Sequence, residues 1–284
     1  MFNKVLVAID LSGPSLELLD ATDDLKKMGM EELVIVHVVR LETARLGVED
    51  CRQKFMEIVE DKQKELKEKG YKITVRQPVG DPAEEIERIS EEENVDLIMI
   101  GSIGKGRGRR FRELVQGSTV NNLIKIGKKP LLVIKYRVEG GKYICREMFP
   151  DKKPATALLA TDFSRNSMET FDFVIGNKKY FDKIVLLHVI DKGYPSEQIE
   201  DKRCRALEKL AQWQQKFEDH GYSTETIVDI GIASREISKR AKEKGATVIV
   251  FSRVGRGIIN EYFIGSTADP VVRQSMIPAF LLKK

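Results

Sequence analysis

The chain has 284 residues, of which 42% are hydrophobic, and its 48 basic and 44 acidic residues leave a net charge of +4. That length accommodates two domains of about 140 residues, each large enough to bury its own core. No uninterrupted apolar run approaches the roughly 18 residues of a membrane-spanning helix. The charge surplus is too small to indicate nucleic-acid binding. The composition therefore favours a soluble globular protein and disfavours membrane and nucleic-acid partners.

The three cysteines, Cys51, Cys145 and Cys204, share no metal-binding spacing. An odd number of such thiols is typical of reduced intracellular proteins. Met1 leads almost directly into a predicted strand, which leaves no room for a signal peptide. We therefore expect a cytoplasmic protein without a metal site.

The first half of the chain alternates short apolar runs, typical of strands, with segments of helical periodicity. The predicted strands lie at 5–9, 33–38, 73–77, 97–100 and 131–134. The predicted helices between them lie at 15–28, at 49–69, from Pro82 onward and at 118–126. This alternation predicts a parallel sheet with helices on both faces.

Residues 97–119 run from a predicted strand through a glycine-rich loop into a helix. The residues of interest in this segment are Gly101, Gly104, Gly106, Gly108, Gly117, Ser118 and Thr119. Glycines let the backbone approach an anion closely, and a helix N-terminus offers free N–H groups. The segment is therefore predicted to bind phosphate, with the two hydroxyl groups as additional donors.

The second half repeats the first. The segment VLVAIDLSGPS at 5–15 corresponds to ALLATDFSRNS at 157–167, and the loop at 97–119 corresponds to VIVFSRVGRGIINEYFIGST at 248–267. Matching pairs are Asp10 and Asp162, His37 and His188, Gly80 and Gly231, Gly104 and Gly255, and Gly117 and Gly265. Recurrence of strand, loop and Gly-Ser-Thr together strengthens the phosphate-site prediction. We predict domains at 1–136 and 155–284 joined by a linker at 137–154.

Both halves resemble the universal stress protein family, whose domains carry a strand-end Asp followed by Ser and the motif G-x-x-G, nine residues, G-S/T. The resemblance covers the chain apart from the linker and is that of a tandem member. It implies an α/β fold with two repeated five-stranded parallel sheets of order 3-2-1-4-5, Rossmann-like and similar to the adenine nucleotide alpha hydrolases. A crevice for a ligand opens where strands 1 and 4 are neighbours.

The resemblance implies ATP or AMP as the ligand. Mg²⁺ is a candidate companion ion, although the chain has no Walker-type acid to hold it. The implied nucleotide-binding residues are Asp10, Ser12, Val38, Gly101, Gly104, Gly117, Ser118 and Thr119 in the first half, and Asp162, Ser164, Val189, Ser252, Gly255, Gly265, Ser266 and Thr267 in the second.

Each half departs from the family motif once. Twelve residues separate Gly104 from Gly117, and Ser252 replaces the first glycine of the second copy. The longer first loop is basic, with Lys105, Arg107, Arg109, Arg110 and Arg112. These residues either clamp phosphate groups or form a solvated loop.

Other prominent residues have structural interpretations. The family resemblance implies a ligand role for Asp10 and Asp162, and Ser12 and Ser164 are better placed than these residues to cap the following helices. His37 and His188 follow buried strand residues without partner ligands, which favours a structural role. Trp213 lies on an apolar stripe with Leu207, Leu210 and Phe217, and is expected in the core.

The chain has neither a P-loop nor a convincing pair of nucleophile and base. The leading hypothesis is an adenine-nucleotide-binding regulatory protein of the stress response, which is not an enzyme. A slow ATP hydrolase or adenylyl-transfer enzyme, and a nucleotide-free scaffold, remain as alternatives. Unpaired edges at 131–134 and 279–282 predict an intramolecular pseudo-twofold pair of domains, compatible with a homodimer through another surface and with a further protein partner.

Overall fold

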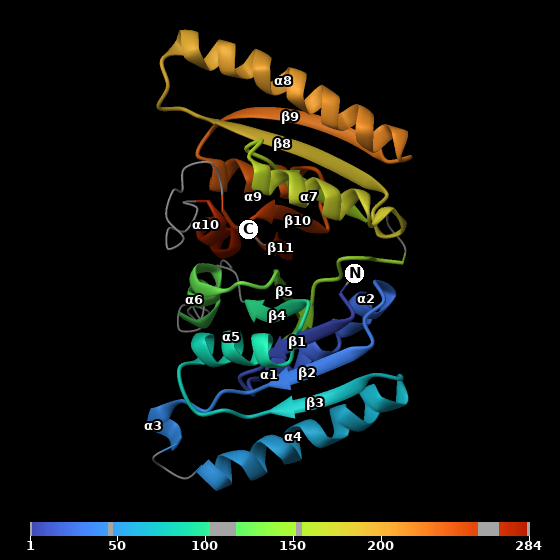
Figure 1. Ribbon diagram of the computed structural model, residues 1–284, viewed down its shortest axis with the longest axis vertical. Coiled ribbons are helices and arrows are strands. Elements are labelled where there is room, and N and C mark those ends of the chain that lie inside the picture. The colour runs from blue at the N-terminus through green and yellow to red at the C-terminus, as the bar shows by residue number, and fades with distance from the viewer. Residues whose placement is uncertain (1, 45–47, 103–117, 152–154, 255–266, 283–284) are drawn as a thin grey trace. The chain divides into compact units, whose positions relative to one another are not determined.

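The computed structural model describes residues 2–44, 48–102, 118–151, 155–254 and 267–282 (Figure 1). The chain divides into two compact units, Met1–Arg146 and Glu147–Lys284. Among the described residues no helix is long and apolar enough to cross a membrane.

The first unit contains a parallel sheet of order β3-β2-β1-β4-β5. Its elements in chain order are β1 (Lys4–Ala8), α1 (Gly13–Leu16), η1 (Glu17–Leu19), α2 (Thr22–Lys27), β2 (Glu32–Val36), α3 (Leu41–Ala44), α4 (Val48–Glu68), β3 (Lys72–Arg76), α5 (Pro82–Glu92), β4 (Leu97–Ser102), α6 (Ser118–Ile126), β5 (Leu131–Glu139) and β6 (Lys142–Cys145). Strands β1, β2 and β4 are buried along nearly their whole length, because helices cover both faces of the sheet.

The second unit repeats this order as β9-β8-β7-β10-β11. Its elements are β7 (Thr156–Ala160), α7 (Arg165–Ile175), η3 (Lys178–Tyr180), β8 (Lys183–Asp191), α8 (Ser196–Asp219), β9 (Ser223–Gly231), α9 (Ala233–Glu243), β10 (Val248–Ser252), α10 (Ala268–Gln274) and β11 (Ala279–Leu282). The predicted fold class and strand order are confirmed in both units.

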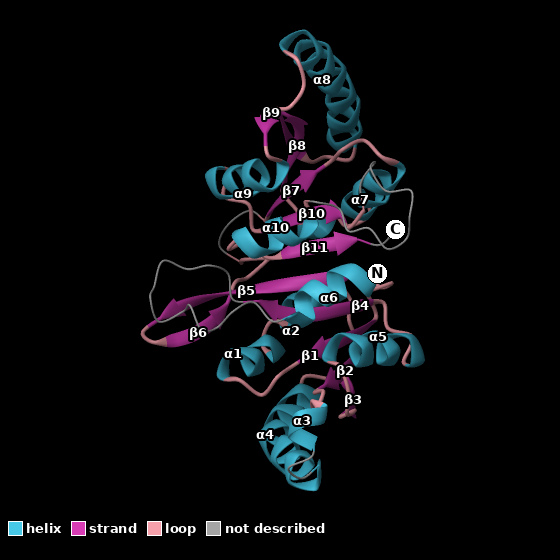
Figure 2. Ribbon diagram, turned by 90° about the vertical axis from the view of Figure 1, so that its left-hand side faces the viewer, coloured by secondary structure: helices cyan, strands magenta, loops and turns pink. Residues whose placement is uncertain are grey.

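Helices cover the two faces as expected for a doubly wound sheet. In the first unit α5 and α6 pack together, whereas α1 lies on the opposite side of the strands (Figure 2). In the second unit α9 packs against α10, and aromatic contacts join α7 to α8 through Phe171 and Trp213, whose ring centroids are 5.0 Å apart. Trp213 is buried as predicted, but Leu207 of the same stripe is 45% exposed.

Two local predictions are wrong. The helix expected at 15–28 consists of the short segments α1, η1 and α2, and the hydroxyl of Thr22 donates to the Leu19 carbonyl at 2.6 Å where the path breaks. Part of the predicted linker is a β-hairpin, since β5 continues to Glu139 and β6 returns antiparallel to it. Gly140 and Gly141 have φ values of 57° and 80°, the positive values that a two-residue hairpin turn requires.

A tyrosine buttresses α2 in the first unit and α7 in the second. Tyr71, just before β3, donates its hydroxyl to the Thr22 carbonyl at 3.3 Å, and Tyr222, just before β9, donates to the carbonyl of Val174. A lysine ammonium lies 4.7 Å from each ring centroid, from Lys26 and Lys178 respectively. Both sets of residues are related by the repeat, so these contacts belong to the shared scaffold.

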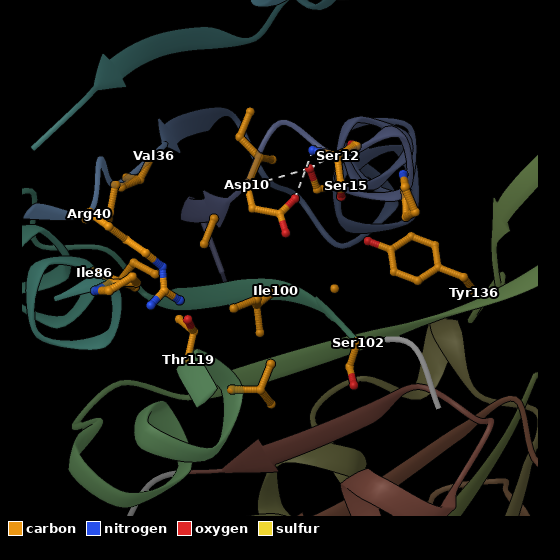
Figure 3. Close-up of a pocket in the computed structure, with 17 residues that line it drawn as sticks. Asp10, Ser12, Ser15, Val36, Arg40, Ile86, Ile100, Ser102, Thr119 and Tyr136 are labelled. Atoms are coloured by element: carbon orange, nitrogen blue, oxygen red, sulfur yellow. Dashed lines mark hydrogen bonds between the residues drawn. The ribbon is translucent and has the colours of Figure 1, made fainter. Parts of the chain in front are cut away.

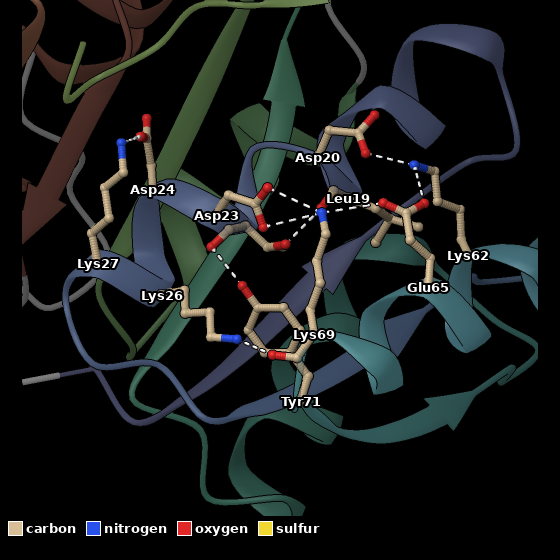
Figure 4. A network of polar contacts seen from close by, with 11 residues as sticks. Leu19, Asp20, Asp23, Asp24, Lys26, Lys27, Lys62, Glu65, Lys69 and Tyr71 are labelled. Atoms are coloured by element: carbon tan, nitrogen blue, oxygen red, sulfur yellow. Dashed lines mark hydrogen bonds and ion pairs between the residues drawn. The ribbon is translucent and has the colours of Figure 1, made fainter. Parts of the chain in front are cut away.

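Charged side chains surround the first of these tyrosines (Figure 4). Lys69 lies 3.1 Å from carboxylate oxygens of both Asp23 and Glu65, and Lys62 lies 2.5 Å from Asp20. These ion pairs join α2 and the residues just before it to the C-terminal end of α4. Because these side chains are partly exposed, each ion pair contributes less than about 1 kcal/mol to the free energy of unfolding.

We expect Tyr71→Phe to lower the free energy of unfolding by about 1 kcal/mol, because it deletes a hydrogen bond to a buried carbonyl. Lys69→Met, in the exposed network, should cost less. Urea denaturation followed by circular dichroism measures both. A loss for Tyr71→Phe that is no larger than that for Lys69→Met would contradict the buttress.

A second buried polar contact joins β4 to β5. Lys135 is fully buried, and its Nζ lies 3.1 Å from the Ser102 hydroxyl oxygen across the paired strands. Burial lowers the pKa of Lys135 from 10.5 to about 7. The folded protein therefore releases this proton at a lower pH than the unfolded chain.

Between about pH 7 and pH 10.5 the unfolded chain retains the Lys135 proton that the folded protein has lost, so the free energy of unfolding should rise with pH. Lys135→Met should abolish this part of the rise, whereas Lys142→Met on exposed β6 should retain it. Denaturant titrations across that range test the assignment. Identical pH profiles for the parent and Lys135→Met would contradict it.

Candidate functional site

The first unit contains a cavity of about 300 Å³ at the carboxyl ends of β1 and β4 (Figure 3). β1 pairs with both β2 and β4, so the connections that leave these strands diverge to opposite faces at this point. The polar lining includes Asp10, Ser12, Arg40, Ser102, Thr119 and Tyr136. The volume is at the lower end of the roughly 300–1,000 Å³ typical of small-molecule pockets.

A strained turn places Asp10 at the cavity. Leu11 has a φ of 63°, a left-handed conformation that costs a bulky residue about 1–2 kcal/mol. The Ser12 N–H donates to Asp10 Oδ1 at 3.0 Å, and the Asp10 N–H donates to the Ser15 hydroxyl at 3.2 Å. Phe163 has a φ of 58° at the repeated position, so both units use the same turn.

Hydrogen bonds keep the Asp10 carboxylate ionised. Burial raises its pKa, but hydrogen bonds from Ser12 and Ser15 outweigh burial and hold the pKa below its ordinary value. Asp10 thus stabilises its own turn through Oδ1 while presenting a negative charge to the cavity. The structural and ligand-binding interpretations of this residue are compatible.

The predicted residues of the first half only partly converge. Asp10, Ser12, Val38, Gly101 and Thr119 all line the cavity. Ser118 is exposed at the start of α6, which also carries Thr119. Gly104 and Gly117 lie outside the described residues, as does the basic segment 105–112.

The two units differ in how their first helices are capped. Ser12 occupies the cap position of α1 but makes no side-chain cap bond, so the prediction for Ser12 is wrong. The Ser12 side chain instead helps to lower the pKa of Asp10 through a hydrogen bond. Ser164 does cap α7, since its hydroxyl accepts the Ser167 N–H at 3.3 Å.

Gly101 is required by a neighbouring side chain. A Cβ atom at Gly101 would lie 1.9 Å from the Tyr136 hydroxyl oxygen and 2.7 Å from its Cζ. The ring of Tyr136 therefore occupies the space that the missing side chain leaves. This contact explains the glycine independently of any phosphate.

The sequence prediction missed Tyr136 and Arg40. Tyr136 was assigned to the domain edge, although Gly140-Gly141 between two β-prone runs is a hairpin signal that could have extended β5 beyond it. Arg40 follows β2 and lines the cavity from the opposite side, as Figure 3 shows. No local pattern distinguishes Arg40 from other basic residues.

In the second unit the corresponding residues bond mainly to one another. Asp162 Oδ1 accepts the Ser167 hydroxyl at 2.6 Å and the Ser164 N–H at 2.9 Å. The Ser252 hydroxyl donates to the Val254 carbonyl at 2.8 Å, so this residue closes a local turn. Val189 lies in β8 and Thr267 immediately precedes α10. Gly255, Gly265 and Ser266 lie outside the described residues.

Asn166 makes a bridging hydrogen bond in the second unit. Its amide Nδ2 donates to the Val254 carbonyl at 3.1 Å, which links the first turn of α7 to the segment after β10. Pro14 occupies the repeated position in the first unit, where no amide is available to make this bridge. The two units therefore differ in hydrogen bonding at this position.

Both strand histidines have structural contacts. His37 Nδ1 lies 3.1 Å from the Ile9 carbonyl oxygen, and His188 Nδ1 lies 2.8 Å from that of Thr161. Burial lowers the pKa of His37. The rings pack on Phe55 and Phe163, with centroids 5.3 Å and 4.7 Å apart. In the described part of the chain no group of three or more His, Cys, Asp or Glu residues is arranged to hold a metal ion.

Comparisons with known proteins agree with the repeated architecture. The universal stress protein family model matches residues 1–135 and 155–283. Universal stress protein MJ0577 of Methanocaldococcus jannaschii is 31% identical over 158 residues, covering 48% of this chain and 96% of the relative. Universal stress protein YxiE of Bacillus subtilis is 31% identical over 151 residues, covering 48% and 100% respectively.

Among solved structures, a universal stress protein from Archaeoglobus fulgidus superimposes with a TM-score of 0.74 at 23% identity, covering 99% of this chain and 96% of that chain. This likeness supports the fold, and the two family matches span both repeats. The chain belongs to the universal stress protein family and contains two of its domains in tandem.

Proposed function

We propose that the first unit binds an adenine nucleotide, ATP or AMP, and that the chain is a stress-response regulatory module. The observation that carries this proposal is the cavity between the ends of β1 and β4, lined by the ionised Asp10, the cationic Arg40 and the Thr119 hydroxyl. A nucleotide offers hydroxyl and base groups for a carboxylate and anionic oxygens for a guanidinium or a helix N-terminus. The membership in the universal stress protein family supports the same ligand class.

Binding without turnover is favoured by the partners of the cavity's polar groups. Asp10 accepts the Ser12 N–H, and the Ser15 hydroxyl donates to the Ser12 carbonyl at 3.0 Å. A general base would instead hold the proton of a nucleophile or of a water molecule. The Ser12 N–H and the Ser15 hydroxyl are thus used to build the turn.

We infer that the first unit is the tighter of two sites. In the second unit Asp162 accepts a serine hydroxyl, and Asn166 bridges the crevice. At the position repeated from Arg40 the second unit has Asp191, whose carboxylate accepts the Gly193 N–H at 2.7 Å. A carboxylate in place of a guanidinium disfavours an anionic ligand.

Asp10→Asn and Asp162→Asn form a matched pair that tests the site. Asn retains an oxygen that can accept the backbone N–H of the turn, so the change removes mainly the charge. We expect Asp10→Asn to weaken ATP or AMP binding about 10-fold or more, as loss of a charged hydrogen bond predicts, and Asp162→Asn to leave the tighter site unchanged. Isothermal titration calorimetry measures affinity and stoichiometry.

Circular dichroism of both variants controls for folding, and phosphate release from ATP checks for turnover. Equal loss of affinity in the two variants, or no loss in either, would contradict the assignment to the first unit. Steady phosphate release by the parent that Asp10→Asn abolishes would favour the slow hydrolase instead.

A further inference from the structure

The Tyr136 hydroxyl is a buried polar group without a hydrogen-bond partner among the described residues. The side chain is only 4% exposed. An unsatisfied buried hydroxyl costs about 1–3 kcal/mol, and most such groups in proteins have a partner. Since this hydroxyl borders the cavity, a ligand is the natural source of the missing hydrogen bond.

The ring of Tyr136 is held in place on two sides. The backbone of Gly101 lies against it so closely that a Cβ atom there would force the ring to shift, and Tyr143 packs edge-on with ring centroids 6.3 Å apart. Figure 3 shows the hydroxyl directed from β5 toward the side of the cavity that holds Asp10. The phenol and the carboxylate thus face a shared part of the cavity.

Tyr136 belongs to a segment that the family matches leave out. These matches end at residue 135 and resume at residue 155, and the β5–β6 hairpin lies between them. The Cys145 thiol lies 3.2 Å from the Glu17 carbonyl oxygen, and the Arg146 N–H donates to the Lys135 carbonyl at 2.8 Å, which fixes the hairpin to the unit. The hairpin therefore adds a wall to the cavity beside the repeated scaffold.

The protonation state of Tyr136 makes its hydroxyl a hydrogen-bond donor at neutral pH. Burial, followed by the nearby Cys145, Asp10 and Glu17, raises the pKa of Tyr136 far above its ordinary value. The hydroxyl is therefore protonated at neutral pH and available as a donor. Asp10 is ionised there and can only accept.

A ligand group that satisfies both residues must accept from the phenol and donate to the carboxylate. A hydroxyl does both, whereas a phosphate group at neutral pH is chiefly an acceptor and is repelled by the carboxylate, and an ammonium group only donates. We propose that Tyr136 and Asp10 together bind a ribose hydroxyl of the nucleotide, so that Tyr136 is a specificity-determining residue of the site. This inference rests on the proposed function of the first unit.

The test compares ATP with its 2′-deoxy and 3′-deoxy analogues on the parent and on Tyr136→Phe, by calorimetry. The parent should bind one of the deoxy analogues about 3- to 10-fold more weakly than ATP, as expected for one neutral hydrogen bond. Tyr136→Phe should bind ATP more weakly by a similar factor and should discriminate less against that same analogue. Such non-additivity identifies a direct contact.

Two further measurements separate a contact from a packing effect. Tyr143→Phe, in the same hairpin, should bind ATP and both analogues like the parent. Thermal unfolding of ligand-free Tyr136→Phe should show a midpoint no lower than that of the parent, because the variant loses an unsatisfied polar group.

Equal binding of ATP and both analogues by the parent would overturn the inference even if Tyr136→Phe failed to fold. Equal ATP affinity of Tyr136→Phe and the parent would also overturn it, while leaving the nucleotide site in place. Failure of the parent to bind ATP and AMP at all would instead remove the proposed function, and the inference with it.

Discussion

The parallel pairing of β1 with both β2 and β4 is the constraint on which the site depends. The crossover from β1 leads to β2 on one side of β1, and β4 lies on its other side. The connections that leave β1 and β4 therefore diverge, and no loop joins these two strand ends directly. Strands β1, β2 and β4 are buried between helices, which holds their ends in place by packing. Polar residues that follow the strands therefore meet at one edge without belonging to the core.

The two repeated units share some local contacts and differ in others. Both units use a left-handed residue after β1 or β7 and a tyrosine hydroxyl donated to a helix carbonyl. They differ where the crevice opens, because Asn166 bridges the second unit whereas the first has Pro14 and a cavity. The two units thus share the strained turn and differ in the hydrogen bonds around it.

The spacing of apolar residues was sufficient to predict the repeated sheet from the sequence. The buried strands are apolar runs, and Pro82 correctly marks the start of α5, where Asp81 accepts the N–H groups of Ala83 and Glu84. The family resemblance added the strand order and the cluster of Asp10, Val38, Gly101 and Thr119, which the cavity brings together. Tyr136 could not be assigned to the site from spacing alone, because its place depends on the register of β5 against β4 and on the close approach to Gly101. The break between α1 and α2 was missed because their apolar residues keep a helical spacing across the irregular segment.

The most direct test of the central claim is a crystal structure determined at saturating ATP. The account predicts nucleotide in the cavity of the first unit, with one ribose hydroxyl about 3 Å from both the Asp10 carboxylate and the Tyr136 hydroxyl. Nucleotide density only in the second unit, or a phosphate group in place of the ribose between these two side chains, would contradict it.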